Sequence, residues 1–275
     1  MNKDSLTIRF LYKTTLGRLL LKPLAHPETS KLVGGLMSTR LSSLFIPFFI
    51  RKHKISMKGV EIPEGGFSSF NAFFTRKRKS PRIDTDPDRL SSPCDGFLTI
   101  YDITEDSVFS IKNTLFSVDT LLKNKKLSAK YRGGLALIFR LTPANYHRYC
   151  YPADGTIVYE KKIPGRLYCV RPTAIYEQPV FIENAREYQV IRSGYFGHIV
   201  QMEVGATLVG KIHNHVSAPV GREVKAGQEK GYFEFGGSTV ILLFKKDTLN
   251  LSKYFRKTIG SSIETPVRFG QTISC

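Results

Sequence analysis

The sequence predicts an α+β fold in which amphipathic helices come first and a β-rich core follows. Near the N-terminus, apolar residues recur at helical spacing with basic residues between them. From Pro93 onward, short apolar or alternating runs are separated by Asp-Gly, Pro-Gly and Ser-Gly pairs, which is the pattern of strands joined by turns. We therefore divide the chain into an N-terminal helical region (residues 1–66) and a β-rich domain (residues 67–275).

Two helices are expected in the N-terminal region. Ile8, Tyr12 and Leu16 recur at helical spacing, and Pro23 breaks this pattern. A second helical pattern covers residues 29–44.

The second helix leads into the apolar residues 45–50 and the basic residues 51–54. Apolar surface bordered by cations suits a helix that lies in a membrane interface, so we expect residues 1–66 to associate with a membrane. The alternative is an ordinary amphipathic helix packed on its own domain. The apolar run is far shorter than the roughly 20 residues that span a bilayer. We expect a protein held peripherally on the cytoplasmic face of the cell membrane.

Composition restricts the partners and the cell compartment. The 41 Lys and Arg outnumber the 23 Asp and Glu, and the resulting charge of +18 indicates an acidic partner, either nucleic acid or anionic lipid. The four cysteines have no paired spacing, which argues against disulfides or a zinc site and suits a reducing compartment. No secretory signal is recognisable.

The most informative stretch is residues 230–244, where two glycines and a serine interrupt two strand-like runs. Gly236 and Gly237 free the backbone of steric limits immediately before Ser238. An unhindered glycine carbonyl next to a serine hydroxyl is what an internal acyl shift needs, whereas the simpler interpretation is a bend in a sheet. Further strands are expected at residues 97–101, 135–141, 157–163, 188–191, 198–204 and 208–212.

Two more polar residues could act on Ser238. Asp95 lies in a turn that opens a strand, and His147 follows the strand at residues 135–141. The three could form a relay in which His147 activates Ser238 Oγ and Asp95 orients the imidazole. Each also has an ordinary explanation, because Asp-Gly pairs are common in turns and a single histidine often fills a core or lies on a surface.

The chain resembles the pyruvoyl-dependent phosphatidylserine decarboxylases over nearly its whole length. The resemblance rests on six motifs in the family's order rather than on one decisive motif. They are Phe70-Asn-Ala-Phe-Phe-Thr-Arg76, Ser92-Pro-Cys-Asp-Gly96, residues 141–148 ending in Tyr-His-Arg, Pro164-Gly-Arg-Leu-Tyr168, residues 204–212, and residues 225–239 ending in Gly-Gly-Ser-Thr.

The resemblance implies a proenzyme that cleaves itself between Gly237 and Ser238. Asp95 and His147 would assist the attack of Ser238 on Gly237. The products would be a large chain, 1–237, and a small chain, 238–275, which stay associated. Ser238 would become an N-terminal pyruvoyl group, the cofactor of the enzyme.

In such an enzyme the pyruvoyl group forms a Schiff base with phosphatidylserine and accepts electrons as CO2 leaves, giving phosphatidylethanolamine. His147 is the candidate acid that reprotonates the product. The resemblance thus makes residues 67–275 the catalytic domain and an anionic membrane surface its partner, without nucleic acid or metal. It does not say whether Arg76, Arg148 or Lys211 contacts the head group.

The chain departs from the family at Cys150. Many members carry there a second histidine, three residues after the first, with an assigned role in decarboxylation. A thiol can donate a proton, but its ordinary pKa of about 8.5 differs from that of imidazole. Cys150 is therefore a possible auxiliary acid, and His147 alone is the alternative.

Two rival functions remain open on the sequence. The charge of +18 and the basic runs at residues 75–79 and 123–126 also suit a β-domain that binds nucleic acid without catalysis. The other rival is a pyruvoyl decarboxylase that acts on a soluble amino acid.

Overall fold

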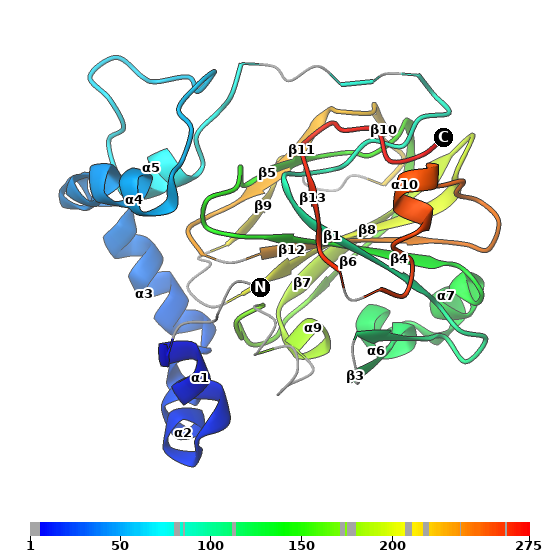
Figure 1. Ribbon diagram of the computed structural model, residues 1–275, viewed down its shortest axis with the longest axis horizontal. Helices are drawn as coiled ribbons and strands as arrows, with labels where there is room; N and C mark the ends of the chain where they lie inside the picture. Colours follow the sequence, from blue (N-terminus) through cyan, green and yellow to red (C-terminus); the bar gives the residue numbers. More distant parts are fainter. Residues whose placement is uncertain are drawn as a thin grey trace.

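The computed structural model describes residues 6–79, 83–84, 86–111, 114–170, 174, 180–206, 211–216, 220–236, 238–261 and 263–275. Helices α1 to α5 lie to one side of a body built from β-strands (Figure 1). The predicted α+β fold, with helices first and a β-rich core after them, is confirmed.

The first predicted helix is two helices, α1 (Leu6–Lys13) and α2 (Thr15–Leu24). Thr14 separates them because its side chain accepts a hydrogen bond from Gly17 N and caps α2. A Cβ on Gly17 would stand 2.1 Å from the carbonyl oxygen of Phe10, so only glycine allows α1 and α2 to pack this closely. Pro23 does not end the helix, since it lies inside the last turn of α2.

The second predicted helix is also divided. It comprises α3 (Pro27–Met37), a short 3₁₀-helix η1 (Arg40–Phe45) and α4 (Ile46–His53). Pro47 lies in the first turn of α4, where its missing N–H costs no helical hydrogen bond. Within the described residues, no single helix is long and apolar enough to cross a membrane. The pair Pro27–Met37 and Arg40–His53 passes that test only when taken together, with a bend of 82° between them.

The body of the molecule is an eight-stranded sheet with the order β10-β6-β7-β8-β12-β4-β1-β13. Every neighbouring pair in it is antiparallel. The strands are β1 (Gly96–Asp102), β4 (Leu135–Leu141), β6 (Gly155–Ile163), β7 (Arg186–Ser193), β8 (Gly197–Gly205), β10 (Glu223–Val224), β12 (Ser238–Phe244) and β13 (Thr265–Val267).

A three-stranded sheet, β5-β11-β9, packs on one face of the large sheet. It consists of β5 (Arg148–Cys150), β11 (Glu229–Phe233) and β9 (Ile212–Asn214). Of the strand expected at 208–212, residues 208–210 lie outside the described residues, Lys211 is not in a strand, and Ile212 begins β9. A separate hairpin pairs β2 (Val108–Ile111) with β3 (Thr114–Ser117).

One apolar core joins the sheets, and β12 runs through it with all seven residues buried. A second cluster, which we call the aromatic cluster, packs Phe49 of α4 and three phenylalanines of α5 against Phe235. The remaining short helices are α5 (Phe70–Phe74), α6 (Val118–Leu122), α7 (Lys125–Ser128), η2 (Ala129–Tyr131), α9 (Val180–Glu183) and α10 (Lys253–Arg256).

Candidate active site

Ser238 is the first residue of β12 and lies in the middle of the large sheet. It pairs with Leu141 of β4 on one side and with Gly205 of β8 on the other. Its side chain is fully buried, and Oγ has no hydrogen-bond partner among the described residues. Buried hydroxyls are normally paired, so an unpaired one is an exception that requires a reason. Gly237, the other half of the predicted cleavage site, lies outside the described residues.

His147 reaches the same end of the sheet from the segment that follows β4. The chain leaves β4 at Leu141, directly opposite Ser238, and returns to Tyr146 and His147 after a short turn. The carbonyl oxygen of His147 accepts a hydrogen bond from Phe233 N at 2.9 Å. This bond ties His147 to the end of β11, whose chain continues toward Ser238.

The imidazole of His147 is held in one tautomer. Nδ1 lies 2.9 Å from the carbonyl oxygen of Asn145. A carbonyl can only accept, so we assign the proton of the neutral ring to Nδ1 and leave the lone pair on Nε2. Nε2 is buried and has no hydrogen-bond partner in the part of the chain that the structure describes. The backbone of Gly236 is close enough to act on the imidazole, which places His147 beside the residues that precede Ser238.

Burial keeps His147 neutral. Removal from water, followed by the nearby charge of Arg76, lowers the pKa of His147 to about 3, although the hydrogen bond with Asn145 opposes the shift. A neutral imidazole with a free lone pair can accept a proton from a hydroxyl at neutral pH. The ring of Phe74 lies over it, with 4.0 Å between the ring centroids, and restricts its rotation.

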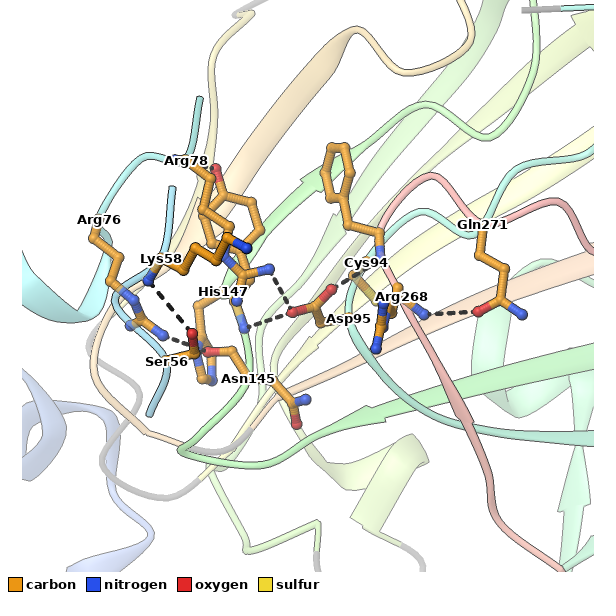
Figure 2. A network of polar contacts seen from close by, with 12 residues as sticks. Ser56, Lys58, Arg76, Arg78, Cys94, Asp95, Asn145, His147, Arg268 and Gln271 are labelled. Carbon is orange, nitrogen blue, oxygen red and sulfur yellow. Dashed lines mark hydrogen bonds and ion pairs between the residues drawn. The ribbon is translucent and has the colours of Figure 1, made fainter. Parts of the chain in front are cut away.

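Asp95 takes a different place from the one that the relay hypothesis gave it. Its Oδ2 accepts hydrogen bonds from Arg78 Nη1 at 2.9 Å and Tyr146 N at 3.3 Å, and its Oδ1 accepts one from Phe269 N at 2.8 Å (Figure 2). The imidazole of His147 is therefore oriented by a backbone carbonyl rather than by Asp95. Asp95 instead holds the backbone of the residue immediately before His147.

Cys150 lies in β5, and its thiol is fully buried. Its Sγ is 3.9 Å from the carbonyl oxygen of Ser92. Burial raises the pKa of this thiol, which makes it a weaker proton donor than an ordinary cysteine. Among the described residues, its Sγ forms no hydrogen bond with Ser238 Oγ or His147 Nε2. Its role as an auxiliary acid stays a prediction.

Arg76 is a site residue to which the sequence assigned no role. It is 2 % exposed, and its Nη2 lies 3.4 Å from the carbonyl oxygen of Asn145, the atom that also binds His147 (Figure 2). Residues 75–79 contain four basic side chains in a row, and nothing in their spacing distinguishes the buried Arg76 from its neighbours. The feature that could have identified Arg76 is the aromatic stretch at residues 70–75 directly before it, because its phenylalanines form the aromatic cluster beside the site.

A second buried polar group faces the same way as Ser238. Alternate residues of a strand share a face, so Ser238, its partner Gly205 and the nearby Glu203 all face the three-stranded sheet. There Glu203 Oε2 lies 2.5 Å from Lys230 Nζ, and both side chains are fully buried. Burial raises the pKa of Glu203 to about 7 and lowers that of Lys230. The pair thus links β8 to β11 beneath the site.

Comparisons with known proteins agree with this geometry. The profile of the family described as phosphatidylserine decarboxylase matches residues 70–275. The chain is 40 % identical over 269 residues to phosphatidylserine decarboxylase proenzyme 2 of Clostridium acetobutylicum. This alignment covers 97 % of this chain and 90 % of the relative. It is 37 % identical over 271 residues to a phosphatidylserine decarboxylase proenzyme of Clostridium botulinum (97 % and 91 %). The proenzyme of Fusobacterium nucleatum is 36 % identical over 269 residues (96 % and 89 %). The chain therefore belongs to the phosphatidylserine decarboxylase family, whose members are decarboxylases.

Proposed function

We propose that the protein is a proenzyme that cleaves itself between Gly237 and Ser238 and then decarboxylates phosphatidylserine to phosphatidylethanolamine. The observation that carries the proposal is that two buried atoms without hydrogen-bond partners, Ser238 Oγ and His147 Nε2, belong to segments that meet at the end of β4. One is a nucleophile and the other a base in the correct tautomer. The family match favours this function over a β-domain that binds nucleic acid.

The cleavage uses only groups of the chain itself. Ser238 Oγ attacks the carbonyl carbon of Gly237 while its proton passes to His147 Nε2. The C–N bond breaks, the nitrogen takes the proton, and an ester through Oγ remains. Loss of the Cα proton of residue 238 then expels the carboxylate of Gly237 and forms a Cα=Cβ double bond. Water replaces the nitrogen, which leaves as ammonia, and residue 238 becomes an N-terminal pyruvoyl group.

The surroundings of Ser238 fit this group. Ser238 lies at the start of β12, buried between β4 and β8. Its hydroxyl forms no hydrogen bond with a described residue, so conversion to a small pyruvoyl group would break none there. When formed, the pyruvoyl group supplies a ketone that bonds to the substrate amine and accepts the electron pair released with CO2. His147 holds and returns a proton there, Asp95 fixes its loop through Tyr146, and the aromatic cluster excludes water.

The two chains stay together because the small chain supplies a central strand. β12 is paired with β4 along its whole length and with β8 from Ser238 to Leu243, and both partners belong to the large chain. β13, also in the small chain, pairs with β1. Separating the chains would expose seven buried residues of β12 to water and would leave β4 and β8 each with one unpaired edge.

The N-terminal helices offer a surface for the membrane that contains the substrate. Leu41 and Leu44 of η1 are each 76 % exposed, and basic residues of α4 follow directly. We propose that these helices lie in the interface of the cytoplasmic leaflet, where anionic lipid attracts the charge of +18. Their exposed large apolar side chains are Phe10, Leu16, Leu19, Leu20, Leu24, Leu32, Leu36, Leu41, Leu44, Phe45 and Phe48.

Intact mass spectrometry of purified wild type and Ser238→Ala tests the proposal. The wild type should give chains 1–237 and 238–275, and the small chain should carry a pyruvoyl group in place of its first amino acid. Ser238→Ala should remain one chain without activity. Thr239→Ala is the matched control, because Thr239 also has a buried, unpaired hydroxyl one residue further along. It should still cleave.

An uncut wild type, or cleavage of Ser238→Ala at the same bond, would refute the self-cleavage mechanism. Turnover of free serine in preference to phosphatidylserine in detergent micelles would instead favour the rival decarboxylase of a soluble amino acid.

A further inference from the structure

We propose that Arg76 is the residue that binds the phosphodiester of the lipid head group. The inference rests on the proposed function and adds a substrate contact to it. Arg76 lies in a buried position, yet its Nε has no hydrogen-bond partner among the described residues. Its other contacts are three long bonds of 3.4 Å, all to the backbone carbonyls of Phe73, Phe74 and Asn145.

A buried guanidinium without an anion is an incomplete site. Removing a charge from water costs several kcal/mol unless a counter-ion and hydrogen bonds replace the water. Arg76 forms no ion pair with any described residue. Burial and the neighbouring Arg78 lower the pKa of Arg76 to about 10, which leaves it charged at neutral pH. An anion bound to Nε would complete the site.

The neighbouring arginines are already neutralised. Arg78 pairs with Asp95 at 2.9 Å, and Arg148 pairs with Glu229 at 2.7 Å. Arg76 is therefore the one cation of these three without a carboxylate partner in the described part of the chain. A planar guanidinium also matches the two free oxygens of a phosphodiester, to which it can donate two parallel hydrogen bonds.

The position of Arg76 suits the head group of a substrate that reacts at Ser238. Arg76 Nη2 and His147 Nδ1 both contact the carbonyl oxygen of Asn145 (Figure 2). The guanidinium and the imidazole are therefore close neighbours. The ring of Phe73 closes one side of the guanidinium, 5.0 Å from Cζ. Only a few bonds separate the amine of a serine head group from its phosphate. This short separation is consistent with a phosphate at Arg76 and a reacting amine near His147.

The phosphodiester is a better partner for Arg76 than the substrate carboxylate. The carboxylate loses its charge as CO2 leaves, so a cation beside it would stabilise the ground state and slow the reaction. The phosphodiester keeps its charge throughout, and binding it costs nothing in the transition state. The rings of Phe74 and Phe235 pack together with 5.2 Å between their centroids. They form an apolar, poorly solvated surface for the carboxylate instead.

The test compares wild type, Arg76→Met and Arg76→Lys, with the exposed Arg192→Met as control. Intact mass first establishes that each variant is processed. Calorimetry then measures the Kd of glycerophosphoethanolamine, which carries the phosphodiester of the product and needs no turnover. Losing a charge-assisted pair of bonds should weaken binding by about 10- to 100-fold in Arg76→Met. Arg76→Lys should lie between, and Arg192→Met should match wild type.

Kinetics separate binding from an effect on His147. With phosphatidylserine in micelles, Arg76→Met should raise KM and change kcat little. With an O-alkylserine, which keeps the free amine and carboxylate but lacks phosphate, Arg76→Met and wild type should turn over equally. Unchanged binding of glycerophosphoethanolamine, or an equal loss with both substrates, would overturn the proposal.

If Arg76→Met is not processed, the Kd of glycerophosphoethanolamine for Arg76→Lys is compared with that for wild type. Lysine keeps the charge but lacks the planar guanidinium, so weaker binding supports the proposal and equal binding contradicts it. An uncleaved wild type would count against the proposed function. Weakened binding in a processed variant bears on Arg76 alone.

Discussion

His147 and Arg76 share one acceptor, the carbonyl oxygen of Asn145, and the charge of Arg76 acts on the imidazole. After burial itself, the charge of Arg76 lowers the pKa of His147 and helps to keep it neutral. The sequence could point to His147 and Ser238, because a family motif surrounds each of them. It could not assign the orienting role to Asn145, because a backbone carbonyl leaves no trace in side-chain identity. For the same reason Asp95 was expected on the imidazole.

The burial of His147 predicts an acid-sensitive proenzyme. In the native state its pKa is about 3, whereas an unfolded histidine titrates near 6.5. Between these values the unfolded state binds a proton that the native state does not, so stability falls as the pH decreases from 6.5 toward 3. The contribution reaches about 1.4 kcal/mol per pH unit. Urea unfolding of Ser238→Ala from pH 7 to pH 4 measures the slope without interference from cleavage.

The control is the double variant Ser238→Ala/His147→Gln. Glutamine does not titrate, so the free energy of unfolding should lose about 1.4 kcal/mol per pH unit less on acidification than in Ser238→Ala. Parallel slopes for the two proteins would show that His147 is accessible to protons in the native state. They would also remove the basis for its neutral, proton-accepting role.

At the scale of elements, close contacts between backbones decide what the periodic pattern could not. The apolar spacing of residues 8–20 is continuous, but the packing of Gly17 against Phe10 requires a break between α1 and α2. Likewise, the short strand β9, which contains His213, forms because it adds to the edge of β11. Such pairings depend on residues far apart in the chain.

Gly231 of β11 gives a prediction at this scale. A Cβ there would lie 1.9 Å from the carbonyl oxygen of His213, a backbone atom that cannot move without separating β11 from β9. Overpacking of this kind typically costs about 1–3 kcal/mol. Because β11 leads into the cleavage segment, Gly231→Ala should lower the unfolding midpoint and slow self-cleavage. A time course on denaturing gels and a urea titration measure both.

Gly194→Ala is the matched control. No atom lies within 4 Å of a Cβ at this position, and Gly194 is not among the glycines with positive φ. It should cleave and unfold like wild type. Cleavage of Gly231→Ala at the wild-type rate would mean that β11 does not determine the geometry of the Gly237–Ser238 bond.

For the whole molecule, the order of helices and strands could be predicted, but the sheet order could not. Periodicity is local, so it indicated strands at residues 135–141 and 198–204. It could not show that β12 lies between β4 and β8, because these pairings join segments far apart in the sequence. This order brings Ser238 to the end of β4, and under the proposed cleavage it would hold chain 238–275 to chain 1–237.

The whole-molecule arrangement also predicts how the protein reaches its substrate. The 3₁₀-helix η1, whose Leu41 and Leu44 are exposed, packs against α4 and α5, the helices that carry most of the aromatic cluster and lie to one side of the β-strands (Figure 1). Leu41→Ser/Leu44→Ser removes apolar surface that is already in water, so the free energy of unfolding should stay within about 0.5 kcal/mol of wild type. Burial of one leucine in the lipid interface contributes about 1.5–3 kcal/mol, so the double variant should bind vesicles at least tenfold more weakly.

Co-sedimentation with vesicles of anionic and zwitterionic lipid at low and high salt measures this loss. Ile263→Ser, which replaces another exposed apolar residue outside the N-terminal helices, is the control and should bind like wild type. High salt should weaken binding to the anionic vesicles by screening the basic residues, while the leucine contribution persists. Equal binding of the double variant and wild type at both salt concentrations would mean that the helices do not insert, and that charge alone brings the active site to the lipid.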